Sequence, residues 1–163
     1  MLKLIGALLL IAAGSFAGYM ESHRLCLRVE KLEAFLRFLS AAKTEIRYSS
    51  LPVESVLRKH GGEFSFFPLS AEDGPDGWGK AWSEAVKAGA GNEGFSRKDI
   101  ELLEGFGAGF GASDTQGQIA HFSLYENLVS AALEEAKKER DGKSKLYRML
   151  GVCGGAAAAI LLC

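Results

Sequence analysis

The chain is apolar at both ends and charged between them. Residues 4–20 contain no charged side chain, and neither do residues 149–163. As helices these runs would be about 26 Å and about 22 Å long, against about 30 Å of bilayer hydrocarbon. Every charged residue except Lys3 lies in between, where burial in lipid would be costly. We therefore expect two membrane spans flanking a water-exposed middle.

The second run reaches the length of a span if the residues before it join it. Leu146 and Tyr147 extend the apolar stretch, and Arg148 can extend its charged head to the lipid headgroups. The predicted organisation is an N-terminal transmembrane helix over residues 1–21, a soluble helical bundle over 22–145, and a C-terminal transmembrane helix over 146–163.

A cleaved signal peptide is the alternative for the N-terminal run. Lys3, an apolar stretch and the small residues Ser15 and Ala17 around Phe16 fit such a signal. A secreted helical protein would then remain. Against it, the helical pattern continues past residue 20 without a turn signal, and a second apolar segment follows at the far end.

Basic residues flank both runs on the inner side and predict the orientation. Lys3 stands alone on the outer side, whereas nine basic residues border the middle region: Arg24, Arg28, Lys31, Lys137, Lys138, Arg140, Lys143, Lys145 and Arg148. Because cytoplasmic flanks carry the excess of Lys and Arg, the middle should face the cytoplasm and both termini the far side of the membrane.

A heptad stripe continues directly from the first apolar run. Apolar residues alternate at spacings of four and three, with Lys43 interrupting the pattern: Leu25, Val29, Leu32, Leu36, Leu39 and Ile46. Residues 1–48 are thus expected to form one helix of about 70 Å. We expect its stripe to pack on the last helix of the same chain; self-association through the stripe is the alternative.

Three short helices are expected between the ends. Pro52 begins the first of them, and Gly61 and Gly62 close it. Residues 63–77 are the least regular stretch. Trp78 and Trp82 mark one face of the next helix.

The third short helix begins at residues 96–99, which resemble a capping box. Glycines at 105, 107, 109 and 111 should weaken this helix, by up to about 1 kcal/mol each.

The last helix is expected from residue 115 to residue 163, again about 70 Å long. Ser113 or Asp114 would cap it. No strand pattern of useful length appears, so the fold class is all-α: a soluble antiparallel helical bundle flanked by the two terminal transmembrane helices. Each span carries GxxxG, at Gly14 and Gly18 and at Gly151 and Gly155, a spacing that lets helices approach closely in lipid.

Four segments in order along the chain resemble the bacterial stage III sporulation protein AB family. These segments are the opening residues 1–7, the segment 45–48 with the following Pro52, the segment 110–114 with the following Gln118, and the ending 146–155. The resemblance covers essentially the whole chain.

This resemblance implies a non-enzymatic membrane component of the channel-like, secretion-like complex between mother cell and forespore in endospore formation. The family resembles the inner-membrane platform proteins of type II secretion systems. The protein would then lie in the mother-cell membrane surrounding the forespore. Its soluble domain would face the mother-cell cytoplasm and bind other members of the complex, above all a cytoplasmic ATPase. A membrane-tethered scaffold unrelated to sporulation remains the alternative from a different class.

The residues predict no catalytic chemistry and no cofactor. There is no GxxxxGK[ST] loop, and Glu21 with His23 lacks a third triad partner. The three cysteines and three histidines do not show the spacing of a metal site. The 19 basic and 20 acidic residues nearly balance, so neither a nucleic acid nor an acidic substrate is indicated. Without a catalytic arrangement, no small-molecule substrate is expected.

The corners between the long helices are the predicted partner-contact site. Glu45 and Tyr48 end the first long helix, Pro52 starts the next helix, and Asp114 and Gln118 begin the last. If the long helices are antiparallel, these corners lie together at the end farthest from the membrane. The alternative is structural: Glu45 and Tyr48 brace the corner while Asp114 caps a helix.

Overall fold

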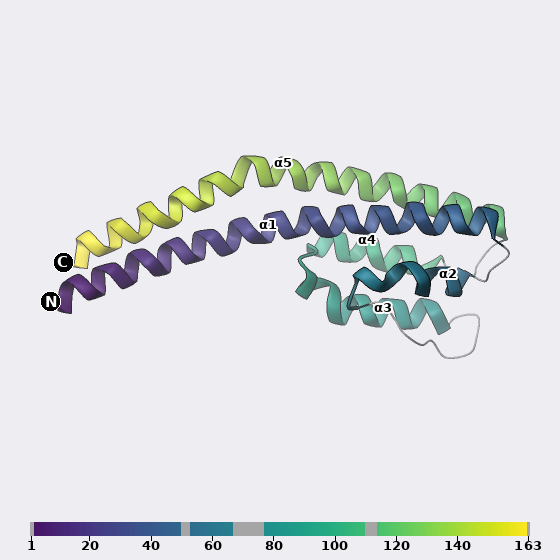
Figure 1. Ribbon diagram of the computed structural model, residues 1–163, viewed down its shortest axis with the longest axis horizontal. Helices are drawn as coiled ribbons and strands as arrows, with labels where there is room; N and C mark the ends of the chain where they lie inside the picture. Colours follow the sequence, from purple (N-terminus) through teal and green to yellow (C-terminus); the bar gives the residue numbers. More distant parts are fainter. Residues whose placement is uncertain (1, 50–52, 67–76, 110–113, 163) are drawn as a thin grey trace. The chain divides into compact units, whose positions relative to one another are not determined.

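The computed structural model describes residues 2–49, 53–66, 77–109 and 114–162. In order along the chain these form five α-helices and two short 3₁₀ helices: α1 (Leu2–Tyr48), α2 (Val53–His60), η1 (Gly61–Glu63), α3 (Gly77–Gly89), η2 (Ala90–Glu93), α4 (Arg97–Ala108) and α5 (Thr115–Leu162). The described residues contain no strand, so the all-α prediction is confirmed (Figure 1).

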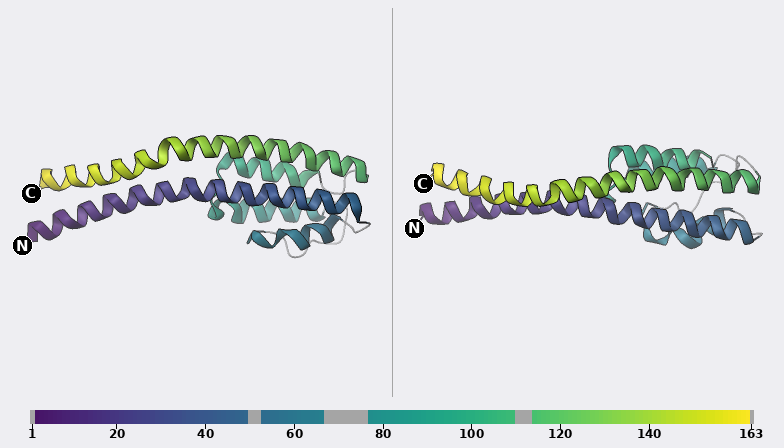
Figure 2. Two further views of the ribbon diagram at one scale, coloured as in Figure 1. Left: turned by 45° about the horizontal axis from the view of Figure 1, so that its top comes forward. Right: turned by 90° about the horizontal axis from the view of Figure 1, so that it is seen from above.

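The two long helices follow the predicted boundaries closely. α1 has 47 residues and α5 has 48. Each is one uninterrupted helix that includes both an apolar run and part of the charged region. The N-terminal end of α1 and the C-terminal end of α5 lie next to one another in every view, as antiparallel helices require (Figures 1 and 2).

The predicted membrane spans are not shown by the structure. Among the side chains that the structure describes, no helix offers a stretch both long and apolar enough to cross a bilayer. Many side chains of the two apolar runs, including those of residues 2–5 and 158–162, lie outside that described set.

The chain divides into two compact units. One comprises Met1–Val29 with Glu135–Cys163, and the other is the continuous segment Glu30–Glu134. We refer to them as the terminal unit and the middle unit. The predicted boundaries at residues 21 and 146 remain predictions.

Aromatic side chains fill the core of the middle unit. Phe106 lies at its centre, with ring centroids 5.6 Å from Phe35, 5.5 Å from Trp82 and 5.2 Å from Phe122, all close to edge-on. Such edge-to-face pairs are favourable beyond the area that they bury. The buried Trp82 indole donates a hydrogen bond of 2.6 Å to the Leu103 carbonyl, so its polar atom is satisfied.

Four of the six residues of the heptad stripe are buried. Val29, Leu32, Leu39 and Ile46 are at most 5% exposed, whereas Leu25 and Leu36 are half-buried. The irregular stretch after residue 63 contributes more than its pattern indicated, because Phe64 and Phe66 are also buried in the core. Lys43, which interrupts the stripe, forms an ion pair with Glu126 of α5.

The glycines of α4 are explained by close packing. A Cβ atom added at Gly107 would lie 2.0 Å from Cδ1 of Trp82, and one at Gly109 would lie 2.2 Å from Cε1 of His121. Glycine therefore permits α3 and α5 to approach α4 here. The helix nevertheless persists to Ala108, with Ser96 and Asp99 forming the predicted capping box at its start.

Polar contacts join the two helices of the terminal unit. The Ser22 and Ser144 hydroxyls lie 2.5 Å apart, and Arg28 donates to Glu139 at 2.7 Å. Ser22 is fully buried and Arg28 is 8% exposed. Because a charge is buried at low cost only when it is paired, this ion pair favours one register of α1 against α5.

Candidate functional site

Glu45 links the end of α1 to α2. Its carboxylate accepts hydrogen bonds from Lys59 at 2.8 Å and from His60 at 2.5 Å. These two hydrogen bonds, that of Lys59 foremost, lower the pKa of Glu45 below its ordinary value of 4.5. Glu45 thus has the bracing role that one interpretation of the sequence predicted, and whether it also contacts a partner stays a prediction.

Tyr48 lies one helical turn further along and is 80% exposed. Among large apolar and aromatic side chains of the middle unit it is exceptionally open to solvent, so bracing of the corner does not explain it. Pro52, predicted to belong to the same corner, lies outside the described residues.

Asp114 caps α5. Its carboxylate accepts a hydrogen bond of 2.9 Å from the Gly117 amide, and its carbonyl accepts one of 2.9 Å from the Gln118 amide. One of the two predicted caps is therefore confirmed; the other, Ser113, lies outside the described residues. Gln118 is 3% exposed and donates to the Gly109 carbonyl at 3.3 Å, so it fastens the end of α4 to the start of α5.

The two predicted corners lie at one end of the middle unit. The end of α1 and the start of α5 are neighbours in both figures (Figures 1 and 2). However, the hydrogen bonds described above run from Glu45 to α2 and from Gln118 towards α4. The buried Gln118 is therefore poorly placed to meet a partner, whereas the exposed Tyr48 is well placed.

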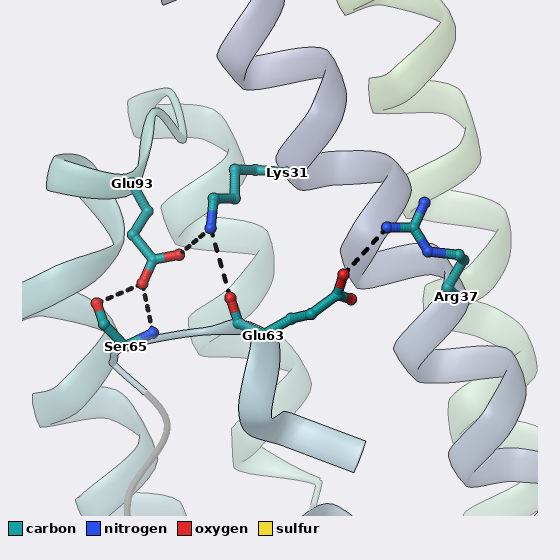
Figure 3. A network of polar contacts seen from close by, with 5 residues as sticks. All are labelled: Lys31, Arg37, Glu63, Ser65 and Glu93. Atoms are coloured by element: carbon teal, nitrogen blue, oxygen red, sulfur yellow. Dashed lines mark hydrogen bonds and ion pairs between the residues drawn. The ribbon is translucent and has the colours of Figure 1, made fainter.

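A polar network that the sequence pattern did not indicate surrounds Glu93 (Figure 3). Lys31 donates to the Glu93 carboxylate at 2.8 Å, and both the amide and the hydroxyl of Ser65 donate to its other oxygen. Burial by itself raises the pKa of Glu93, but the hydrogen bonds from Lys31 and Ser65 outweigh it and lower the pKa. The network ties α1 to two segments far away in sequence.

Arg37 belongs to the outer edge of this region. Its guanidinium lies 3.3 Å from the Glu63 carboxylate, and both side chains are largely exposed (Figure 3). Exposed pairs of this kind add little stability. The guanidinium therefore remains open to further contacts, and no spacing rule in the sequence singled it out.

A groove runs along the outward face of α1 between Arg37 and Tyr48. Its volume is about 580 Å³, and Glu45 and His60 also line it. The groove lies beside the predicted contact residues Glu45 and Tyr48. It could not be found from sequence, because it depends on how α2 returns along α1.

The predicted packing glycines are only partly described. Gly18 is buried and Gly14 half-buried in the terminal unit, whereas the surroundings of Gly151 and Gly155 lie outside the described residues. Their packing role stays a prediction. Within the described part of the chain, no three His, Cys, Asp or Glu side chains are grouped to hold a metal ion.

Together these features define a class: an all-helical protein with two long helices, an aromatic core in its middle unit and a groove beside the end of α1. The chain belongs to the stage III sporulation protein AB family, whose model matches residues 3–163. It is similar to the stage III sporulation protein AB of Bacillus subtilis (strain 168), at 23% identity over 170 residues and 99% of both chains.

No solved structure matches the chain. Membership of the family supports a role in sporulation. The family's description names a sporulation component and no enzymatic activity.

Proposed function

We propose that the protein is a non-enzymatic membrane platform in the complex that connects mother cell and forespore. In this proposal the terminal unit anchors the chain in the mother-cell membrane, and the middle unit binds other members of the complex, including a cytoplasmic ATPase, from the cytoplasmic side. The assignment to sporulation follows from the family, and the platform role is what the family resemblance implies.

Exposed apolar side chains in the terminal unit carry the membrane part of the proposal. Leu9, Phe16, Met149 and Leu150 are between 56% and 64% exposed. Two helices alone cannot shield such side chains on all sides, and in water their exposure would be unfavourable. In lipid the same surface is accommodated, and the Ser22–Ser144 contact supplies a polar link between the helices.

The basic flanks support the proposed orientation. Arg24 is 75% exposed in its side chain and Lys143 is 51% exposed, at the inner boundary of the two runs. A hydrogen bond to Glu139 raises the pKa of Lys143 further above its ordinary value. Basic residues that flank a membrane span favour keeping the adjoining segment, here the middle unit, on the cytoplasmic side.

Anchoring can be tested by introducing charges into the terminal unit. We expect Leu9→Asp with Leu150→Asp to release the protein from membranes in alkaline carbonate, since an aspartate near the centre of a span, as at position 9, costs about 2.5–3.5 kcal/mol and the aspartate at position 150 adds to that cost. The matched control is Leu124→Asp with Leu128→Asp, which alters two leucines of the middle unit that are 54% and 43% exposed. This control pair should stay in the membrane fraction.

The sporulation role can be tested with the same variants. In a sporulating bacterium that lacks its own family member, the control pair should restore heat-resistant spores and the terminal pair should not. A terminal pair that is released by carbonate yet still restores sporulation would show that anchoring is not needed. Release of the unmodified chain by carbonate would contradict the membrane assignment itself.

A further inference from the structure

Small side chains form the floor of the groove beside the end of α1. Ser40 and Ala41 lie on one turn of the helix and Thr44 on the next, between Arg37 and Tyr48. The Thr44 hydroxyl already donates to the Ser40 carbonyl at 2.8 Å, so it does not demand a further partner. Arg37 and Tyr48 are eleven residues apart, about 16 Å or three helical turns.

The acidic group in the wall of the groove is neutralised. Glu45 is only 16% exposed in its side chain and is held by Lys59 and His60. Its negative charge is therefore balanced from within the protein and does not repel an acidic ligand. Lys59 itself remains 63% exposed.

Ser49 supplies an unused polar atom at the end of the groove. Its Oγ atom is buried and has no hydrogen-bond partner among the residues that the structure describes, although the Ser49 amide donates to the Glu45 carbonyl at 2.7 Å. A buried hydroxyl without a partner costs free energy. A ligand that hydrogen-bonds to it would recover that loss.

Two exposed cations lie at or beside the groove. Arg37, which lines it, is 62% exposed in its side chain, and Lys59, which pairs with Glu45 in the wall, is 63% exposed. The exposed Glu63 forms a 3.3 Å pair with Arg37 that is open to solvent. Arg and Tyr are enriched among the residues that dominate binding energy at protein interfaces.

We propose that this groove binds an acidic segment of another protein of the complex. The segment would lay an apolar side chain on the floor of small residues, contact the Tyr48 ring, and place a carboxylate near Arg37 and Lys59. A peptide helix of about three turns has the matching length. The assignment rests on the proposed function, because it names the surface through which the platform holds a partner.

Site-specific photo-crosslinking tests the proposal in the full-length chain. A benzophenone amino acid replaces Tyr48, and the control places it at Arg97 of α4, whose side chain is 93% exposed. In sporulating cells the probe at position 48 should capture a peptide of another protein that has a net negative charge. Capture should exceed that at position 97 by about tenfold.

Charge reversal provides the second arm. Arg37→Glu should lower the crosslinking yield at position 48, and should weaken binding of a synthetic peptide with the captured sequence by about tenfold. Lys98→Glu, a reversal at an exposed position of α4, should change neither by more than about twofold. Arg37→Gln should reduce peptide binding and crosslinking yield by an intermediate amount. A graded loss with charge indicates recognition of charge and not damage to the fold.

Several results would overturn the proposal. These are equal capture at positions 48 and 97, no capture at all, capture of a basic peptide, capture of lipid, or capture of this chain's own sequence, such as its acidic residues 72–76. Unchanged binding of the captured peptide to Arg37→Glu would also overturn the proposal. Carbonate extraction of the same cells reports on anchoring separately, so a failed groove and a failed membrane assignment give different results.

Discussion

Gly107 shows how a single missing side chain sets the spacing of two helices. Substitution by alanine would place a methyl group 2.0 Å from the buried indole of Trp82, which cannot move aside in a filled core. We expect Gly107→Ala to lower the free energy of unfolding by about 2 kcal/mol. Thermal unfolding of the full chain in detergent, followed by circular dichroism, measures the change.

Gly142 is the matched control for that substitution. It lies inside α5 with nothing within 4 Å of an added Cβ atom. Gly142→Ala should therefore stabilise the protein by up to about 1 kcal/mol through helix propensity alone. If both alanine variants shift the unfolding temperature in the same direction, the packing explanation for Gly107 is wrong.

Glu93 should make stability depend on pH. Its pKa is lowered in the folded protein, so its contribution is present above the unfolded value and is lost as the pH falls through the folded value. At neutral pH we expect Glu93→Gln to cost about 2 kcal/mol, because hydrogen bonds from Lys31 and Ser65 lose their charged acceptor.

The comparison with wild type at acidic pH completes this test. As the pH falls below the unfolded pKa and through the lowered folded pKa of Glu93, the unfolding temperatures of wild type and Glu93→Gln should converge, since the wild-type carboxylate then becomes protonated. Glu101→Gln, at a side chain that is 68% exposed, should match wild type at both pH values. A difference between wild type and Glu93→Gln that grows on acidification would contradict the network described here.

Contacts between residues distant in sequence were the hardest feature to predict. The Ser96 and Asp99 capping box and the Asp114 cap follow local rules of spacing, and the structure confirms them. The Glu93 network and the groove at Arg37 join segments that are distant in sequence. No local rule encodes such contacts, because they arise only when the helices are packed.

The start of α5 depends on one carboxylate. Asp114 accepts from the Gly117 amide and satisfies one of the amides that have no partner within the helix. We expect Asp114→Ala to destabilise the protein by about 1 kcal/mol. Gln116→Ala, an exposed change within the same turn, should have a much smaller effect in the same unfolding experiment.

Complex formation distinguishes capping from partner contact at Asp114. If Asp114→Ala abolishes co-purification with other members of the complex while the unfolding temperature is unchanged, the capping role is not the reason for this residue. Equal, small losses in stability and in complex yield are what the capping role predicts.

At the level of elements, the long periodic pattern of α1 predicted helix length and buried face, whereas short segments without a period did not indicate their place in the core. The heptad stripe correctly indicated both the length of α1 and its buried face. Residues 63–66 carry no period, yet Phe64 and Phe66 enter the core beside Phe35 and Trp82. The glycines of α4 looked unfavourable to a helix when judged by propensity alone, because their benefit lies in contacts with α3 and α5.

The distribution of apolar surface separates the two units of the molecule. The middle unit buries the phenylalanine and tryptophan side chains that the structure describes and exposes Tyr48, whereas the terminal unit exposes Leu9, Phe16 and Leu150. The sequence predicted this difference through its uncharged ends. In the proposed function this difference has a purpose, because a platform would be held at one face of a bilayer by its apolar surface while its other parts remain accessible to partners.

Labelling of single cysteines from one side of the membrane tests this assignment most directly. Cys26, Cys153 and Cys163 are replaced by serine, and one new cysteine is placed either at Lys3 or at Arg97, whose side chain is 93% exposed. The chain is produced in bacteria that are not sporulating, so that the far side of the membrane is the outside of the cell. We predict that an impermeant maleimide labels Lys3→Cys in intact cells and Arg97→Cys only after permeabilisation; labelling of Arg97→Cys in intact cells would contradict the account.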